Sequence, residues 1–189
     1  MILSLDISTS VIGIAIFDND YKLHELTWVK FNQKEKSLFK KLDFFIEFME
    51  KYKHINFTDI AIETELLKFA GKFSNAETIN KLARMNAIIS GFLYKKYKIE
   101  PTYYNVQTAR KLAFPNLIIP QSHPSKKNLI WEAVMKAEPQ INWRYGKTGK
   151  LVDGSLDAAD AYVIGMAHIV SSIKIKNKTK KANLVENKE

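Results

Sequence analysis

The chain has 189 residues, 46% of them hydrophobic, which is enough for one domain with a substantial core. Lys and Arg outnumber Asp and Glu by 29 to 20, and the net charge of +9 favours an acidic partner, nucleic acid first, over a merely solvated lysine-rich surface. The sequence contains no cysteine, which excludes disulfides and thiolate zinc sites and suits a reducing cytosol.

The first stretch, MILSLDIST, has no basic segment and carries Asp6 within its apolar run. We therefore expect neither a signal peptide nor a membrane anchor there. No other stretch approaches the roughly 18 uncharged apolar residues that a membrane span requires. These features predict a soluble, intracellular protein without a membrane partner.

The first half of the chain predicts four strands and two helices. Three strands rich in Ile, Leu and Val are separated by short turns, so they should be antiparallel neighbours; they span residues 2–7, 11–17 and 22–31. An amphipathic helix is expected over 35–53. The run DIAIE at 59–63 predicts a buried central strand with Glu63 at its carboxyl end. A capping box over 74–77 opens a long helix that ends near residue 97.

The second half repeats this order in a weaker form. A strand is predicted over 102–106, followed by three helices at 107–112, 124–138 and 155–171. Pro and Gly residues in 139–153 indicate a loop or lid before the last helix. We expect one domain over 1–172 and a basic, disordered tail over 173–189.

This order predicts an α/β fold. Its sheet should be mixed and five-stranded, with three antiparallel strands followed by parallel ones and with helices on both faces. Chemistry in such sheets gathers at the carboxyl ends of the central strands. Asp6 and Glu63 lie at two such ends. If these strands are neighbours, both carboxylates face the start of the last helix.

That helix begins GSLDAADAYVIG, with Asp157 and Asp160 three positions apart on one face. Like charges at this spacing repel, and a basic side chain, a helix terminus or a metal ion could stabilise them. With Asp6 and Glu63 added, four acids would converge, and each raises the cost of ionising the next. We therefore expect metal to hold the pair.

Oxygen ligands without Cys or paired His select Mg²⁺ or Mn²⁺. Four carboxylates leave room for two ions about 3.5–4 Å apart, the separation that keeps the attacking and leaving oxygens of a phosphodiester in line. The predicted catalytic and metal-binding residues are thus Asp6, Glu63, Asp157 and Asp160.

Some of these acids also have an ordinary structural explanation, although Asp160, further into the helix between two alanines, is harder to explain in this way. Asp6 could be a turn or cap residue, and Asp157 an acidic first-turn residue stabilised by the helix dipole. Glu65 competes with Glu63 as the acid that follows the strand. His168, about two turns after Asp160, either supports the acids or is a helix-end residue stabilised by the dipole. The prediction rests on the four acids together.

Basic and aromatic residues around these acids are predicted to contact DNA, although solvation is the simpler explanation for any single Lys. A loop after the acidic strand offers a Lys for phosphate and a Phe for an unpaired base, and other basic residues open the helix at 124–138 or precede the last helix. The predicted set is Lys72, Phe73, Lys126, Lys127, Arg144, Lys147 and Lys150.

Three stretches resemble the RuvC-type Holliday junction resolvases of the RNase H-like superfamily. LSLDISTSVIGIAIFD looks like the first hairpin of that family, IAIET like its second acidic strand, and LDAADAYVIGMAH like its closing helix. The resemblance covers residues 1 to about 170 and makes Asp6, Glu63, Asp157 and Asp160 the matching metal-binding acids.

The sequence departs from the family at three places. Ser8 stands where many members have Gly, and Leu66 where some have an aromatic wedge, so Phe69 or Phe73 would have to substitute. The long stretch before the last helix favours a phage or other mobile-element branch. The resemblance implies the cytoplasm of a bacterium or, for a phage protein, of its host.

The resemblance also implies a homodimer that makes paired cuts in four-way DNA junctions, leaving 5′-phosphate and 3′-hydroxyl ends. The dimer would form through the long helix before residue 97, whose stripe Ala83, Ala87, Ser90 and Gly91 suits close packing on a partner or on its own sheet. Two alternatives stay open: an RNase H-like nuclease for other branched DNA, duplex or RNA/DNA hybrids, and a non-catalytic nucleic-acid-binding module.

Overall fold

A computed structural model describes residues 1–64, 76–120 and 126–186, with side chains described up to residue 177. One sheet contains all five strands of this part of the chain: β1 (Ile2–Ile7), β2 (Val11–Phe17), β3 (Leu23–Lys30), β4 (Asp59–Glu63) and β5 (Thr102–Tyr104). The helices are α1 (Leu38–Met49), continued by the short 3-10 helix Glu50–Tyr52, α2 (Ala76–Tyr97), α3 (Val106–Ala113), α4 (Lys126–Ala137) and α5 (Ser155–Glu186).

The strand order β3-β2-β1-β4-β5 confirms the predicted mixed sheet. β2 runs antiparallel to both β1 and β3, whereas β4 is parallel to β1 and β5 is parallel to β4. Four strands therefore end at the same edge of the sheet, and only β2 begins there. This edge receives the segments that follow Ile7, Lys30, Glu63 and Tyr104.

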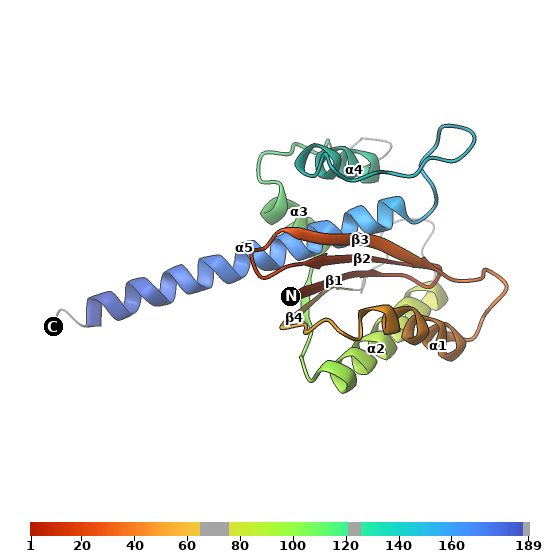
Figure 1. The fold of residues 1–189 in the computed structure, drawn as a ribbon, viewed down its shortest axis with the longest axis horizontal. Coiled ribbons are helices and arrows are strands. Elements are labelled where there is room, and N and C mark those ends of the chain that lie inside the picture. The colour runs from red at the N-terminus through yellow and green to blue at the C-terminus, as the bar shows by residue number, and fades with distance from the viewer. Residues whose placement is uncertain (65–75, 121–125, 187–189) are drawn as a thin grey trace.

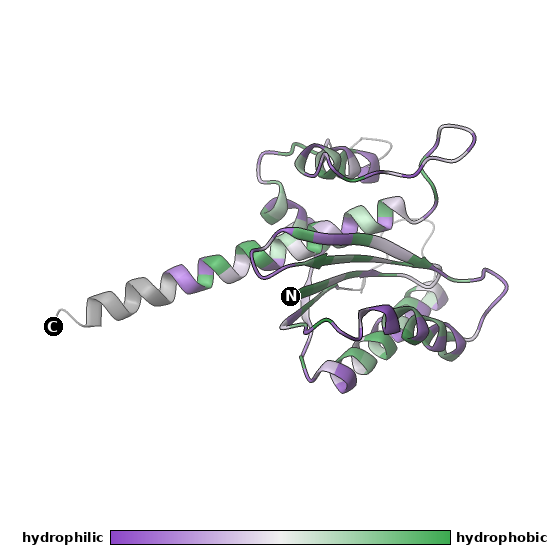
Figure 2. Cartoon of the chain, viewed as in Figure 1, coloured by the Kyte–Doolittle hydropathy of each residue, from purple (hydrophilic) through white to green (hydrophobic). Residues whose placement is uncertain are grey.

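Helices cover both faces of the sheet (Figure 1). α1 and α2 pack on one face, where Phe45 and Met85 join a core with Leu3, Leu5 and Ile62. On the other face, α3, α4 and α5 form a second core whose members include Ile2, Ala61, Ala109, Val134 and Ala159. Figure 2 shows the hydrophobic strands between helices whose hydrophilic sides face outward.

The alternation of strand side chains explains which face receives the acids. Leu3, Leu5 and Ile7 of β1 point toward α1 and α2, so Asp6 points toward α5. In β4, Ile60 and Ile62 belong to the α1–α2 core, which places Glu63 on the α5 face as well. Because Leu5 pairs with Ile62, the next residues along the two parallel strands, Asp6 and Glu63, are neighbours.

α5 lies unusually close to the sheet because small residues face it. A Cβ at Gly13 would come 2.0 Å from the backbone oxygen of Asp157, so only glycine fits there. Ala158, Ala159 and Ala161 are completely buried, and Ser4 Oγ donates a 2.6 Å hydrogen bond to the carbonyl oxygen of Ala161. The glycine and the alanines therefore fix where the helix begins over the sheet.

By length and composition, Ser155–Asn177 of α5 would suffice to cross a membrane. Most of its apolar window, 61%, is buried inside the protein. Packing on the sheet accounts for this apolar composition.

The structure corrects the predicted ends of several elements. β5 stops at Tyr104 because Asn105 caps α3: its side-chain oxygen accepts hydrogen bonds from the backbone N–H groups of Gln107 and Thr108. Residues 139–153, predicted as a loop or lid, contain a tight turn closed by a bridge between Tyr145 and Leu151. The first two residues of the predicted capping box, 74 and 75, lie outside the described residues.

The carboxyl-terminal segment also differs from the prediction. α5 continues to Glu186, whereas the sequence analysis ended the last helix at residue 171; the disordered tail over 173–189 stays a prediction. After Gly165 the sequence contains neither Gly nor Pro, so nothing breaks the helix.

Candidate active site

The structure brings together the four predicted acids at the carboxyl edge of the sheet. Asp6 and Glu63 come from adjacent parallel strands, and Asp157 and Asp160 come from the first two turns of α5. Asp160 is the most enclosed of the helix pair, with a side chain only 5% exposed. Residues separated by most of the chain length thus form one acidic centre.

Burial and mutual repulsion raise the pKa values of both strand acids. Burial raises the pKa of Asp6 well above its usual range, and the charges of Glu63, Asp160 and Asp157 raise it further against the opposing effect of Lys127. The pKa of Glu63 rises to about 7, again through burial first and the charge of Asp160 second. The fully ionised centre is therefore costly without a cation.

Two basic side chains neutralise the helix pair. Lys127 of α4 lies between its two carboxylates, with Nζ 3.0 Å from Asp157 Oδ1 and 3.3 Å from Asp160 Oδ2. Arg110 of α3 donates from Nη2 to Asp160 Oδ1 at 3.1 Å. In the structure, Lys127 and Arg110 offset the negative charge of Asp157 and Asp160, whereas the sequence analysis predicted that a metal ion would do so.

The electrostatics of Lys127 reflect this position. Burial lowers the pKa of Lys127, but the charges of Asp160, Asp6 and Asp157 outweigh that effect, so the net shift is upward. Lys127 was predicted to contact DNA; here it pairs with the acids, and contact with DNA stays a prediction. The positive charge of Lys127 lies at the position where a cation offsets the repulsion among the carboxylates.

Hydrogen bonds from α2 fix the end of β4. Asn86 Nδ2 donates to the carbonyl oxygen of Glu63 at 3.0 Å, and Ser90 Oγ donates to Asn86 Oδ1 at 3.2 Å. Asn86 and Ser90 are both buried. Ser90 thus serves its own sheet, whereas Ala87 and Gly91 of the same small-residue stripe are exposed. The homodimer stays a prediction.

The donor set fits Mg²⁺ or Mn²⁺ in chemistry, since it offers carboxylate oxygens with excess negative charge. Among the side chains of 1–64, 76–120 and 126–177, no three from His, Asp or Glu are arranged to hold one ion as they stand. Lys127 Nζ lies between two of the donors. A divalent ion would therefore have to displace Lys127 and draw the carboxylates together, and the predicted ions stay a prediction.

The other predicted DNA contacts are exposed or lie outside the described residues. Lys72 and Phe73 fall within 65–75, as do Glu65 and the wedge candidates Leu66 and Phe69, so their predictions lie outside the described part. Lys126 is exposed at the start of α4. Arg144, Lys147 and Lys150 are exposed on the segment before α5. Exposure suits contact with phosphate, and their binding to DNA stays a prediction.

His168 does not belong to the acidic centre. Its Nδ1 lies 3.1 Å from Tyr104 Oη, and its Nε2 lies 3.3 Å from Oδ1 of Asp59, the residue that opens β4. It is buried in the middle of α5. Both predictions for His168, as support for the acids or as a helix-end residue, are wrong, because α5 extends far past it and its partners lie elsewhere.

Sequence reasoning missed Arg110. It lies 50 residues before Asp160 in the chain, so no local pattern links the two. The sequence held one weak signal for Arg110. Asn105 caps the short helix α3, and Ala109 of this helix is completely buried in the core beneath α5. The next residue, Arg110, is therefore held close to α5.

No protein-family model and no curated protein sequence matches the chain. Solved structures do match its fold. Thermus thermophilus RuvC in complex with a Holliday junction substrate aligns with a TM-score of 0.61 at 10% identity over 92% of this chain and 94% of that one. The yeast mitochondrial Holliday junction resolvase Ydc2 aligns with a TM-score of 0.63 at 12% identity over 97% of this chain and 83% of that one. The chain thus has the RNase H-like fold of the RuvC-type resolvases.

Proposed function

We propose that the chain is a structure-selective endonuclease that resolves four-way DNA junctions by metal-dependent phosphodiester hydrolysis. The observation that supports this most strongly is the acidic centre, because Asp6, Glu63, Asp157 and Asp160 converge there at a high electrostatic cost. Groups with such perturbed pKa values cluster at functional sites. The likeness in fold to structures described as Holliday junction resolvases adds support.

The four carboxylates would hold one or two Mg²⁺ or Mn²⁺ ions. Asp6 feels the charges of all three other acids, so it is the proposed shared ligand. When bound, the ions would activate the attacking water and stabilise the leaving 3′ oxygen. The proposed products carry 5′-phosphate and 3′-hydroxyl ends.

Lys127 and Arg110 have different parts in this proposal. The Lys127 side chain is 49% exposed on a flexible stem, so it can leave the carboxylates and pair with a phosphate of the substrate. Arg110 is only 17% exposed and is anchored on Asp160. It therefore stays in place and orients that carboxylate.

The substrate and assembly are part of the same proposal. The net charge of +9 suits a DNA backbone. A homodimer would present two acidic centres to the two strands of a junction, and the exposed Ala87 and Gly91 on α2 allow a partner helix to approach closely. The site of action would be the cytoplasm of a bacterium or of a phage host.

The test is cleavage of a labelled immobile four-way junction with Mg²⁺, with Mn²⁺ and with chelator. The proposal expects paired cuts with either metal, none with chelator, and none from Asp6→Asn, which should still bind the junction. Parallel flap, duplex and RNA/DNA hybrid substrates test selectivity. Equal cutting of all substrates would contradict junction resolution, and metal-independent cutting would contradict the mechanism.

A further inference from the structure

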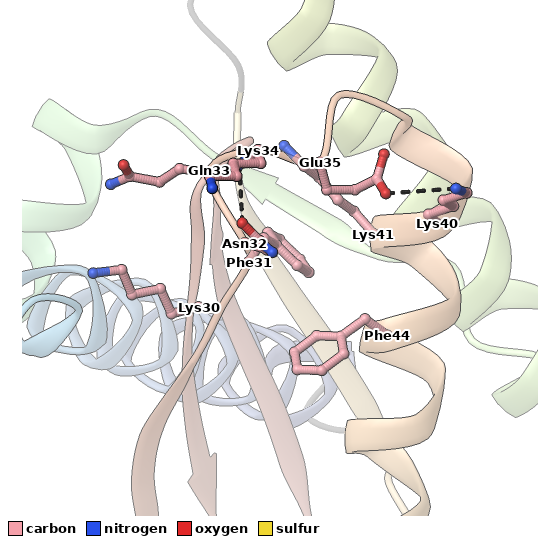
Figure 3. Close-up of a pocket in the computed structure, with 9 residues that line it drawn as sticks. All are labelled: Lys30, Phe31, Asn32, Gln33, Lys34, Glu35, Lys40, Lys41 and Phe44. Carbon is pink, nitrogen blue, oxygen red and sulfur yellow. Dashed lines mark hydrogen bonds and ion pairs between the residues drawn. The ribbon is translucent and has the colours of Figure 1, made fainter.

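A groove separate from the acidic centre lies between the end of β3 and the start of α1 (Figure 3). Its lining includes Lys30, Lys34, Lys40 and Lys41, together with the aromatic ring of Phe44. Phe44 packs edge-on against buried Phe31, with 6.2 Å between ring centres. The groove thus combines an aromatic ring with four lysines and one carboxylate, that of Glu35.

This groove continues toward the acidic centre. A neighbouring hollow shares Lys30 and Gln33 with it and extends to Asp157. Lys30 also forms a 2.7 Å ion pair with Asp153, in the segment that leads into α5. A chain molecule bound at the acids could therefore continue along the end of β3 into the groove.

Positive charge is crowded in the groove. Lys34 lines the groove and forms no ion pair with any residue that the structure describes, and Lys40 lies 3.8 Å from Glu35. Lys36 lines an adjoining hollow that shares Gln33 and Lys41 with the groove. Its Nζ donates to the carbonyl oxygen of Gln33 at 3.2 Å, and it has no ion pair within the described part of the chain. Lys41 is buried and donates from Nζ to the carbonyl oxygen of Thr9 at 2.6 Å.

The environment of Lys41 shows the same crowding. Burial lowers the pKa of Lys41, the charges of Lys36 and Lys81 lower it further, and Glu35 opposes them. Bound anions would relieve this repulsion, so the charge of the groove is complementary to a polyanion.

An exposed aromatic ring adds a second kind of contact. Phe44 is 48% exposed although it lines the groove. Aromatic side chains within a basic groove serve as stacking platforms for nucleic-acid bases. Phe39, on the same helix, is 69% exposed but does not line the groove, and this makes it a matched control.

We propose that this groove binds the phosphate backbone of the DNA strand that continues from the acidic centre, with an unpaired base stacked on Phe44. The inference rests on the proposed function and deepens it by assigning a second contact surface for the same substrate. Lys34 and Lys36 contact phosphates, while Lys41 positions the β1–β2 turn next to Asp6.

The first experiment measures junction affinity of the full chain by fluorescence anisotropy in chelator over a series of salt concentrations. The double variant Lys34→Glu/Lys36→Glu should lower the salt slope of log K by about 2, one for each lost phosphate contact. The control Lys53→Glu/Lys95→Glu changes the net charge equally, using exposed lysines after the 3-10 helix Glu50–Tyr52 and near the end of α2, toward the opposite edge of the sheet. Equal effects of the two doubles would overturn the inference.

The second experiment compares Phe44→Ala with Phe39→Ala. Phe44→Ala should weaken junction binding at least about fivefold without changing the salt slope, and Phe39→Ala should have no effect. Identical affinities for the two variants would overturn the stacking contact. If the wild type cuts junctions but all groove variants match their controls, the inference fails and the proposed function stands; if the wild type binds no DNA, both fail.

Discussion

Two polar clusters join α5 to the sheet, and their charges are balanced differently. Around His168, each ring nitrogen meets one partner, the hydroxyl of Tyr104 or the carboxylate of Asp59. At the acidic centre, four carboxylates share two basic side chains, Lys127 and Arg110. A cluster whose polar groups all have partners is explained by its contribution to the stability of the fold. An excess of negative charge indicates instead a functional site that binds a positively charged ligand from outside the chain.

The largest expected difference between the clusters concerns activity. Asp6→Asn should reduce junction cleavage by at least about a thousandfold, because it removes the proposed shared ligand. It should leave binding unchanged or improved and should raise the free energy of unfolding, since it relieves the repulsion among the acids. Single-turnover cleavage, junction binding and denaturant unfolding measure these effects. Cleavage at the normal rate would remove Asp6 from the mechanism.

Removing a base from the acidic centre should have the opposite effect on stability. Arg110→Met leaves the buried carboxylate of Asp160 with Lys127 alone, so we expect a loss of about 2–3 kcal/mol in the free energy of unfolding. Lys111→Met, at the exposed next position of α3, is the control and should change little. Urea unfolding in chelator measures both variants, and equal stabilities would show that Arg110 does not offset the acids.

The acidic centre should also make the metal-free protein less stable as pH rises. Folding raises the pKa of Glu63 from 4.5 to about 7, so the folded state binds more protons than the unfolded state between these values. The stability contributed by protonated Glu63 is complete below pH 4.5 and is lost as pH rises through about 7. We expect a loss of about 3 kcal/mol from this group, since each unit of pKa difference corresponds to about 1.4 kcal/mol.

Glu63→Gln should flatten this pH dependence, as followed by thermal unfolding in chelator. Added Mn²⁺ should oppose the loss in the wild type, since it stabilises the ionised carboxylates. A wild type whose stability stays constant over the same pH range would contradict the electrostatic account of Glu63.

The smallest effect is expected at the balanced cluster. His168→Leu keeps most of the side-chain volume but loses both hydrogen bonds, so the free energy of unfolding should fall by about 1 kcal/mol. Junction cleavage should stay within about threefold of the wild type, because His168 lies apart from the acids. A loss of cleavage much larger than the loss of stability would show that the two clusters are coupled.

Much of the fold and the acidic centre could be predicted because their signals are local. Alternation along β1 and β4 assigns Asp6 and Glu63 to one face, and the three-residue spacing aligns Asp157 with Asp160. Short connections predicted that β1, β2 and β3 are antiparallel neighbours, whereas the pairing of β1 with β4 was only assumed before the structure showed it.

The remaining features depend on contacts between distant residues. Lys127 lies 30 residues before Asp157, and Arg110 lies 50 before Asp160, so their ion pairs appear only after α3 and α4 pack on α5. The same holds for the partners of His168. The contact of Gly13 with Asp157 also requires the packed helix, and it defines how closely the acids approach.

Calorimetric titration of Mn²⁺ into the metal-free full chain tests the acidic centre most directly. We expect saturable binding by the wild type, strong weakening in Asp6→Asn and Asp160→Asn, and unchanged binding in Asp59→Asn, whose carboxylate belongs to the balanced cluster. Absence of Mn²⁺ binding in the wild type, or equal binding by all three variants, would contradict the assignment of these acids as a metal site.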